Sequence, residues 1–510
     1  MSKPVNLAME FAQGMTPPPT LPPHRRQFVV GPTPFNLDQT WRHCPIAPAG
    51  WLSHCPELRV ASGPDASGET WILLGMAIET RPERPAPLAS IAQTETAAVS
   101  HLYTSWAGRW LLLGPGTVHL DASGLLGCFY GADQGGRTWA SSSAGLLADI
   151  VNASAIDSRC LRYEVGISWY TPPRTRFLGL RRLLPSQVLH LPDGDIVPRP
   201  LTPAIQPNRQ SSDTLWQIQT GLVTTLKQLP AIGVPIWLGL TAGYDSRLLL
   251  GLSQVAQIEV KPFTRIAARM SVADRLLPPQ LAHTGGYTHT FLRRGKRFPE
   301  RQALVNSHSG GQISAGDAEP FVRGDRDGLK GIAFGGHGFA IASGFYKLRD
   351  LPATLTSATE GAQQIANLFQ EPLTSTATAG LQDWLEWVLA HPEPHLDWRD
   401  RFFLEQRQAG WLSTKEQVYD LTDLERFPIL NCARLYSLLL SIPAEQRLGS
   451  KIQTELLQRV SPRLMAYPFN PSDFYFGPMR VIKSKAKDLP QYVLAKAIGK
   501  LRYFLGALTF

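Results

Sequence analysis

The stretch Val234–Leu250, VPIWLGLTAGYDSRLLL, decides the fold of this chain. It begins with an apolar run that ends at Leu240, and such a run predicts a buried strand. A tight turn, Thr241–Ser246, follows and leads directly into an apolar segment with helical character. A strand that passes through a short turn into a helix is the first part of a β–α–β unit, so the stretch indicates a parallel α/β sheet.

The segments on both sides of this stretch continue the same pattern. Ser211–Leu229 carries apolar residues at helical spacing after a Ser-Ser-Asp start, which predicts a helix. Ile258–Thr264 and Thr288–Leu292 are predicted strands, and Asp274–Thr284 between them is a predicted helix. From about Thr354 onward the pattern is helical, and no strand is expected there.

The first part of the chain has a different character. From about Trp41 to Leu191, short apolar runs are separated by Gly, Pro, Asp and Ser, which is typical of antiparallel strands. Asp121–Gly124, DASG, is a hairpin turn by composition. Residues 17–34 are rich in proline and predict a lead segment without packed elements. We therefore expect a lead at 1–38, a mainly β domain at 39–205 and an α/β domain at 206–510.

Composition narrows the class of protein. The chain has 510 residues, 43% of them hydrophobic and 18% charged, which is globular and excludes a disordered, collagen-like or coiled-coil protein. Lys plus Arg is 50 and Asp plus Glu is 41, so the net charge is +9, which suits an anionic substrate such as a nucleotide. No signal-like N-terminus and no run of about 18 apolar residues is present, so a cytoplasmic protein without a membrane partner is expected.

The cysteines argue against a disulfide framework and against a structural zinc site. There are five, they are scattered, and no two form a C-x-x-C pair. They are Cys44, Cys55, Cys128, Cys160 and Cys432.

The turn Thr241–Ser246 carries the residues that point to chemistry. Small residues at Ala242 and Gly243 allow close approach of a ligand to the backbone, and the start of a helix offers N–H groups and a positive dipole end. Thr241 and Ser246 add hydroxyl groups, and Asp245 adds an oxygen ligand for a metal. The turn fits a pyrophosphate site, and it equally fits a capped helix that follows a strand. It is neither a P-loop nor a G-x-G-x-x-G turn.

TAGYDS resembles the S-G-G-x-D-S pyrophosphate loop of the asparagine synthetase superfamily, which includes asparagine, β-lactam and lasso-peptide macrolactam synthetases. Thr stands for the first Ser and Ala for the first Gly. The resemblance implies that ATP and Mg²⁺ are used and that Asp245 binds the metal and acts in catalysis. The loop residues that it implies in ATP and pyrophosphate binding are Leu240, Thr241, Ala242, Gly243, Tyr244, Asp245 and Ser246.

Three later segments resemble the same family in the same order. Ser271–His289 is similar to the stretch after the second strand, with Asp274 at the place of the family's helix-opening acid. Gly336–Tyr346, GHGFAIASGFY, is similar to G-x-G-G-D-E-L-F-G-G-Y, which implies that Gly336 and Gly338 lie at the phosphates. Phe427–Pro443 is similar to the family's P-F-L-N helix.

The first half resembles the family's glutamine-amidotransferase domain, over Gly108–Leu147 and Phe177–Leu191. The resemblance therefore implies an α/β fold with an amidotransferase-like α/β/β/α sandwich, then a parallel-sheet ATP-pyrophosphatase (PP-loop) domain with a helical C-terminal part. Glutamine-using members begin with a catalytic Cys at position 2, whereas this chain has Ser2. We expect a sandwich retained as an inactive scaffold, the alternative being that Ser2 is the nucleophile.

A second departure concerns the metal. The family's Asp-Glu pair is replaced by Ala340 and Ile341, neither of which offers an oxygen ligand from its side chain. Acids just upstream are candidates to substitute for the pair. They are Asp317, Glu319, Asp325 and Asp327.

Other candidate residues have two interpretations each. Lys483 and Lys485, with Lys487, lie where a family lysine stabilises the acyl-adenylate, and they equally fit a solvated basic tail. Phe263 lies at the family's adenine site, and core packing is the preferred alternative. His337 is interpreted as a hydrogen-bonded loop histidine. Four tryptophans have helical core spacing and are interpreted as packing residues: Trp384, Trp387, Trp398 and Trp411.

These features predict an ATP-dependent, AMP-forming ligase that joins a carboxylate substrate to an amine, giving an amide, lactam or macrolactam in natural-product biosynthesis. Partner proteins of such a pathway are expected, and nucleic acid is not. The alternative is a non-catalytic ATP-binding or scaffold protein, which the Ala340–Ile341 departure favours. An ATP-pyrophosphatase acting on tRNA also fits the charge, but the lack of cysteine pairs and the amidotransferase-like first half argue against it.

Overall fold

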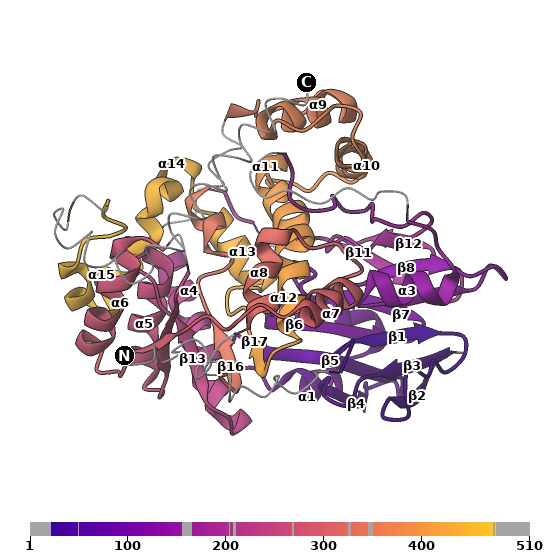
Figure 1. Cartoon of the computed structure of the whole chain (residues 1–510), viewed down its shortest axis with the longest axis horizontal. Coiled ribbons are helices and arrows are strands. Elements are labelled where there is room, and N and C mark those ends of the chain that lie inside the picture. The colour runs from indigo at the N-terminus through magenta and orange to yellow at the C-terminus, as the bar shows by residue number, and fades with distance from the viewer. Residues whose placement is uncertain are drawn as a thin grey trace, which may run out of the picture.

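The computed structural model contains three β-sheets in two parts of the chain (Figure 1). Two antiparallel sheets come first, and a parallel sheet with covering helices follows. The described residues are 22–48, 50–155, 166–202, 205–207, 211–267, 270–324, 328–344, 350–472 and 475. Among them, no helix is both long and apolar enough to cross a membrane.

The first two sheets have six strands each, and all their pairs are antiparallel. In spatial order the first sheet contains β10 (Arg181–Arg182), β8 (Phe129–Ala132), β9 (Thr138–Ser141), β1 (Phe28–Gly31), β3 (Gly50–His54) and β2 (Arg42–Ile46). The second contains β12 (Ile196–Pro198), β11 (Gln187–His190), β7 (Thr117–Leu120), β6 (Trp106–Gly114), β5 (Thr70–Glu79) and β4 (Val60–Pro64).

These two sheets pack face to face as a sandwich, because every second side chain of their strands points inward. Val30 of the first sheet and Ile72 of the second belong to one apolar cluster between the sheets. Their neighbours Val29 and Trp71 point to the opposite faces, because successive strand side chains alternate. Helix α3 (Ala144–Val151) covers one outer face, while α1 (Pro87–Ile91) and α2 (Val99–Leu102) cover the other. The predicted α/β/β/α arrangement is confirmed. The expectation of a proline-rich lead without packed elements is wrong at its C-terminal end, because β1 is a buried strand that pairs with β3 and β9.

The prediction of a hairpin turn at Asp121–Gly124 is wrong. Strand β7 before it belongs to the second sheet and β8 after it to the first, so the segment crosses between sheets. Asp121 is fully buried and accepts hydrogen bonds from the backbone of Leu125 (2.9 Å) and from Asn431 Nδ2 (2.7 Å). Because these partners satisfy the Asp121 carboxylate, a segment with the composition of an exposed turn can be buried where the chain crosses between the sheets.

The parallel sheet is present as predicted. Its five strands are, in spatial order, β15 (Thr290–Leu292), β14 (Lys261–Arg265), β13 (Ile236–Gly239), β16 (Gly331–Phe334) and β17 (Leu424–Arg426). The expectation that no strand follows Thr354 is wrong, because β17 pairs with Gly331–Ala333 at the sheet edge. Three residues are too few to show a period, so only this pairing makes β17 a strand.

Helices pack around the parallel sheet and fill its core. Helix α5 (Tyr244–Ala256) lies between α4 (Ser211–Gln228) and α15 (Lys451–Val460) in one large apolar cluster (Figure 1). This part of the chain also contains α6 (Val272–Thr284), α7 (Pro299–Ser309), α8 (Ala315–Arg323), α9 (Ala358–Phe369), α10 (Thr376–Ala390), α13 (Ala433–Leu440) and α14 (Ala444–Arg447), besides α11 and α12, which are described next.

One long helix joins the two parts. It runs without a break from α11 (Trp398–Phe402) through a π-helix (Phe403–Leu412) into α12 (Ser413–Tyr419). Just beyond it, Asp420 forms a buried ion pair with Arg109 of β6 at 2.7 Å. Removing one partner of a buried pair leaves an uncompensated charge, so this contact fixes the sandwich against the helical part.

Candidate functional site

The strand order of the parallel sheet predicts where a ligand binds. From β13 the chain moves outward to β14 and β15, then returns to the other side of β13 with β16 and β17. The loops after β13 and β16 therefore diverge, and in open α/β sheets such a switch point leaves a crevice at the carboxyl ends of the strands. A cavity of about 740 Å³ lies there, and its lining includes 239–241, 243–246, 263–265 and 335–337. We call it the sheet-edge cavity.

The loop Thr241–Ser246 is held by its own side chains. Ser246 Oγ accepts from Thr241 N at 3.0 Å, Asp274 Oδ1 from Ala242 N at 2.8 Å, and Thr241 Oγ1 from Gly243 N at 3.2 Å. In this structure these three N–H groups therefore donate within the protein. Gly243 is the N-cap of α5 and offers no side-chain acceptor, so the first-turn N–H groups from Tyr244 onward are the donors available for an anion.

Asp245 projects from the first turn of α5 and lines the sheet-edge cavity. Gln453 Nε2 donates to Asp245 Oδ1 at 3.1 Å, and burial raises the pKa of Asp245 to about 6. Gly336 lies directly against it, since a Cβ at Gly336 would stand 2.5 Å from the Asp245 Cβ. A buried carboxylate with a raised pKa gains from a cation that restores its ionised form.

The residues at this position fit a magnesium ion only in part. From the loop, Asp245 lines the cavity together with the hydroxyl-bearing Thr241 and Ser246. Asp274 of α6 lines it too, but its two carboxylate oxygens already accept from Ala242 N and Ser271 Oγ. Across the described residues, no group of three or more His, Cys, Asp or Glu is arranged to hold a metal. Magnesium commonly keeps several waters and relies on substrate phosphates, so one carboxylate is sufficient when a nucleotide supplies the other oxygens.

An arginine–histidine pair lines the cavity beside Asp245. Arg426 Nη2 donates to His337 Nδ1 at 3.1 Å, so Nδ1 is an acceptor and the ring proton lies on Nε2. Burial, followed by the charges of Arg426, Lys415 and Arg407, lowers the pKa of His337 well below its usual value. His337 is thus a neutral, hydrogen-bonded loop histidine, as the sequence indicated.

Arg265 adds further positive charge to the cavity lining. Arg265 Nη1 donates to the hydroxyl of Tyr419 at 3.1 Å, and both residues line the cavity. Burial acts to raise the pKa of Tyr419, but the cations Arg265, Arg426 and Lys415 lower it overall. Arg265 and Arg426 were not predicted as site residues. Each ends a strand of the parallel sheet, β14 and β17, and β17 itself was not predicted.

A segment near the C-terminus, residues 467–470, packs against the loop and the start of α5. Phe469 stacks on Tyr244 with ring centroids 4.1 Å apart and planes at 2°, and Arg247 lies 4.0 Å from the Phe469 centroid. Arg247 also donates to the carbonyl of Tyr467 at 2.7 Å, and Asn470 N donates to the carbonyl of Ala242 at 3.3 Å. Tyr244, the aromatic residue of TAGYDS, therefore helps to hold the C-terminal segment against the loop.

The other predicted residues are placed as follows. Phe263 is 7% exposed and packs with Leu292 and Trp237, while its edge still lines the cavity. Ala340 lines the cavity, whereas Ile341 is buried in the core. Leu240 is buried, and Gly336 lines the cavity but Gly338 does not. Residues outside the described part are Lys483, Lys485, Lys487, Asp325, Asp327 and Ser2.

Two of the upstream acids, Asp317 and Glu319, lie in the described part of the chain, and neither lines the cavity. Asp317 accepts from Trp411 Nε1 at 2.8 Å and lies 3.6 Å from Lys415 Nζ. Glu319 forms an ion pair with Arg323 at 2.6 Å. Both carboxylates already have cationic or hydrogen-bonding partners, so neither stands in this structure where it would replace the missing pair.

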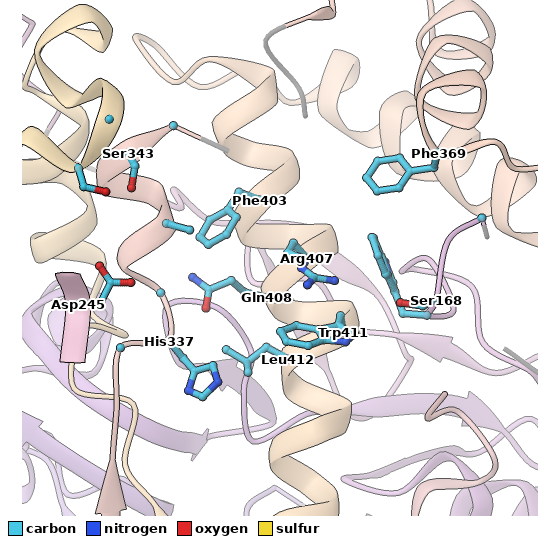
Figure 2. A pocket seen from close by; sticks show the side chains of 18 residues that line it. Ser168, Asp245, His337, Ser343, Phe369, Phe403, Arg407, Gln408, Trp411 and Leu412 are labelled. Atoms are coloured by element: carbon cyan, nitrogen blue, oxygen red, sulfur yellow. The ribbon is translucent and has the colours of Figure 1, made fainter. Parts of the chain in front are cut away.

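A second cavity of about 730 Å³ adjoins the first (Figure 2). Both are lined by Asp245, Gly336, His337, Ala340, Ser343 and Ser450. Gly338 and four aromatic side chains line only the second, which we call the aromatic cavity: Trp169, Phe369, Phe403 and Trp411. Trp384 and Trp398 are buried core residues as expected. Trp411 packs against the same apolar cluster and in addition lines the aromatic cavity.

Comparisons with known proteins give no family for this chain. No family model matches it, and no curated protein matches it. Among solved structures, it is similar to one described as "Structure of the allosteric regulatory enzyme of purine biosynthesis", with 10% sequence identity and a TM-score of 0.22. That match covers 68% of this chain and 72% of the other. A TM-score this low supports no argument about fold or function.

Proposed function

We propose that the chain is an ATP-dependent, AMP-forming amide synthetase of the asparagine synthetase type, with ATP in the sheet-edge cavity. The observation that carries the proposal is the position of this cavity at the switch point of a parallel sheet, with Asp245 and the first turn of α5 on its wall. Its volume suits a ligand of nucleotide size. The TAGYDS resemblance supports ATP as this ligand.

The proposed reaction has two steps. A carboxylate oxygen of the acid attacks the α-phosphorus of ATP, the bond to the bridging oxygen breaks, and pyrophosphate leaves with the electron pair. The nitrogen of an amine then attacks the acyl carbon, loses a proton, and AMP leaves. The products are an amide, AMP and pyrophosphate.

The chain's own residues have distinct roles in these steps. The first-turn N–H groups of α5 bind the departing pyrophosphate, where preorganised donors stabilise developing charge. Arg265 and Arg426, which both line the cavity, contribute positive potential. Asp245 holds Mg²⁺, which neutralises phosphate charge. Cytoplasmic location, an amine partner and natural-product pathway proteins stay predictions, as do roles for Lys483 and Lys485.

The alternative is a non-catalytic ATP-binding or scaffold protein. Ala340 and Ile341 at the place of the family's acidic pair favour it, and so does the hydrogen bonding of the loop N–H groups to Ser246, Asp274 and Thr241. Under this alternative the cavity binds ATP without transferring AMP, or binds no nucleotide.

ATP–pyrophosphate exchange with a panel of carboxylic acids separates these functions. The proposal expects exchange that depends on Mg²⁺ and falls by orders of magnitude in Asp245→Asn, because the lost group acts mainly in the transition state. Asp213→Asn is the matched control, since Asp213 also lies in the first turn of a helix but is exposed. Calorimetry with ATP, with and without Mg²⁺, is the second measurement. No ATP binding in folded protein would refute the enzyme and favour the scaffold.

A further inference from the structure

The aromatic cavity is built from parts of the chain that lie far apart in sequence. Ser168 and Trp169 come from the sandwich part, Phe369 ends α9, and the π-helix contributes Phe403 and Trp411. Figure 2 shows Ser168 and Phe369 on the side opposite Asp245 and Ser343, with the π-helix between them. A cavity with such distant walls exists only in the assembled protein.

The π-helix determines which side chains line this wall. Phe403, Arg407, Gln408, Trp411 and Leu412 all line the cavity, in steps of four and five residues. A regular α-helix would rotate part of this set away, whereas the i→i+5 pattern keeps it on one face. π-helical turns are uncommon and occur often at functional sites.

The aromatic side chains stand at their positions through mutual contacts. Trp169 lies edge-on to Phe369 with centroids 5.9 Å apart. The guanidinium of Arg407 lies 3.7 Å from the Trp411 ring centroid and 5.4 Å from that of Trp169. The wall therefore combines flat apolar surfaces with one fixed positive charge.

We propose that the aromatic cavity binds the acid substrate, and that this substrate is a carboxylic acid with a flat aromatic body. The inference rests on the proposed function, because Asp245, Gly336 and His337 line both cavities and a carboxylate at this junction faces the ATP phosphates. Aromatic rings favour flat partners over aliphatic chains of equal size. Arg407 attracts the negative charge of the acid.

The test measures binding of 2-naphthoate to the full chain by equilibrium dialysis, without nucleotide. Octanoate is the probe of equal charge and similar apolar size, and 2-naphthalenemethanol is the probe without charge. We expect 2-naphthoate to bind most tightly of the three. Phe369→Leu and Phe403→Leu should each weaken its binding about 3- to 10-fold, the value of one aromatic contact, while ATP affinity stays unchanged.

Phe35→Leu is the matched control, because Phe35 is a half-buried aromatic residue in the outer cluster of the sandwich. It should leave 2-naphthoate binding unchanged. Octanoate binding as tightly as 2-naphthoate, or no effect of either cavity variant in folded protein, would overturn the inference. Exchange with aliphatic acids only would overturn it while the proposed function stands. Binding of 2-naphthoate as expected without any ATP binding would refute the proposed function and support the cavity as an aromatic-acid site.

Discussion

Replacing Asp245 by Asn should stabilise the protein at alkaline pH while it removes the proposed activity. Burial raises the pKa of Asp245 from 3.8 to about 6. The folded state therefore holds the proton more tightly than the unfolded state, and the ionised carboxylate costs folding free energy. This penalty is nearly absent below pH 3.8, grows as the pH rises through the window from 3.8 to about 6, and is complete above it.

The size of the effect follows from the shift. About two pKa units correspond to roughly 3 kcal/mol. Asp245 is only partly buried, and solvent screening reduces this to about 1–2 kcal/mol. Asn keeps the shape of the side chain but carries no charge. We therefore expect the free energy of unfolding of Asp245→Asn to exceed that of the parent protein by this amount at pH 8 and to be equal to it near pH 4.

Urea unfolding of both proteins at pH 4 and pH 8 is the assay. Asp213→Asn is the control, since an exposed first-turn acid should give no gain that grows with pH. Saturating Mg²⁺ and ATP at pH 8 should stabilise the parent more than the Asn variant, because the variant lacks the Asp245 carboxylate that is proposed to hold the ion. If Asp245→Asn were less stable than the parent at pH 8, the ionised Asp245 carboxylate would not cost the protein folding free energy, and the reasoning would be refuted.

Three further predictions concern the same site and the sandwich. Gly336→Ala should lower both the free energy of unfolding, by about 1–3 kcal/mol, and ATP affinity, because the new Cβ would meet Asp245 at 2.5 Å; unchanged thermal unfolding and calorimetry would contradict this. Phe469→Ala removes the ring stacked on Tyr244 and should weaken ATP binding about 2- to 10-fold in calorimetry, and equal affinity would show that the stack does not order the loop. The chain should release no glutamate from glutamine, with or without ATP, and release abolished by Ser2→Ala would instead identify Ser2 as a nucleophile.

The strand–turn–helix around Thr241–Ser246 could be predicted because its signals are local. An apolar run, a turn of small residues and a helical apolar period all lie within Val234–Leu250. The helix α4 was expected at Ser211–Leu229 and is found at Ser211–Gln228 for the same reason. Local patterns of this kind do not depend on what the segment contacts.

The cations of the sheet-edge cavity could not be predicted in the same way. Arg426 belongs to a three-residue strand, and its relation to His337 depends on the pairing of β17 with β16. The hydrogen bond of the Ala242 N–H depends on Asp274, which lies 32 residues further along the chain. Such relations follow from packing between segments and leave no periodic signal in the sequence.

What the sequence by itself determined is the division into a mainly β part and an α/β part, the two kinds of sheet and the loop with Asp245, because hydrophobic period and turn chemistry are properties of neighbouring residues. What only the tertiary structure decided is the surroundings of that loop. The buried crossing at Asp121, the edge strand β17 and the aromatic cavity each need partners from distant parts of the chain. The raised pKa of Asp245 was also decided by the tertiary structure, since the pKa of a carboxylate depends on the groups that the fold places around it.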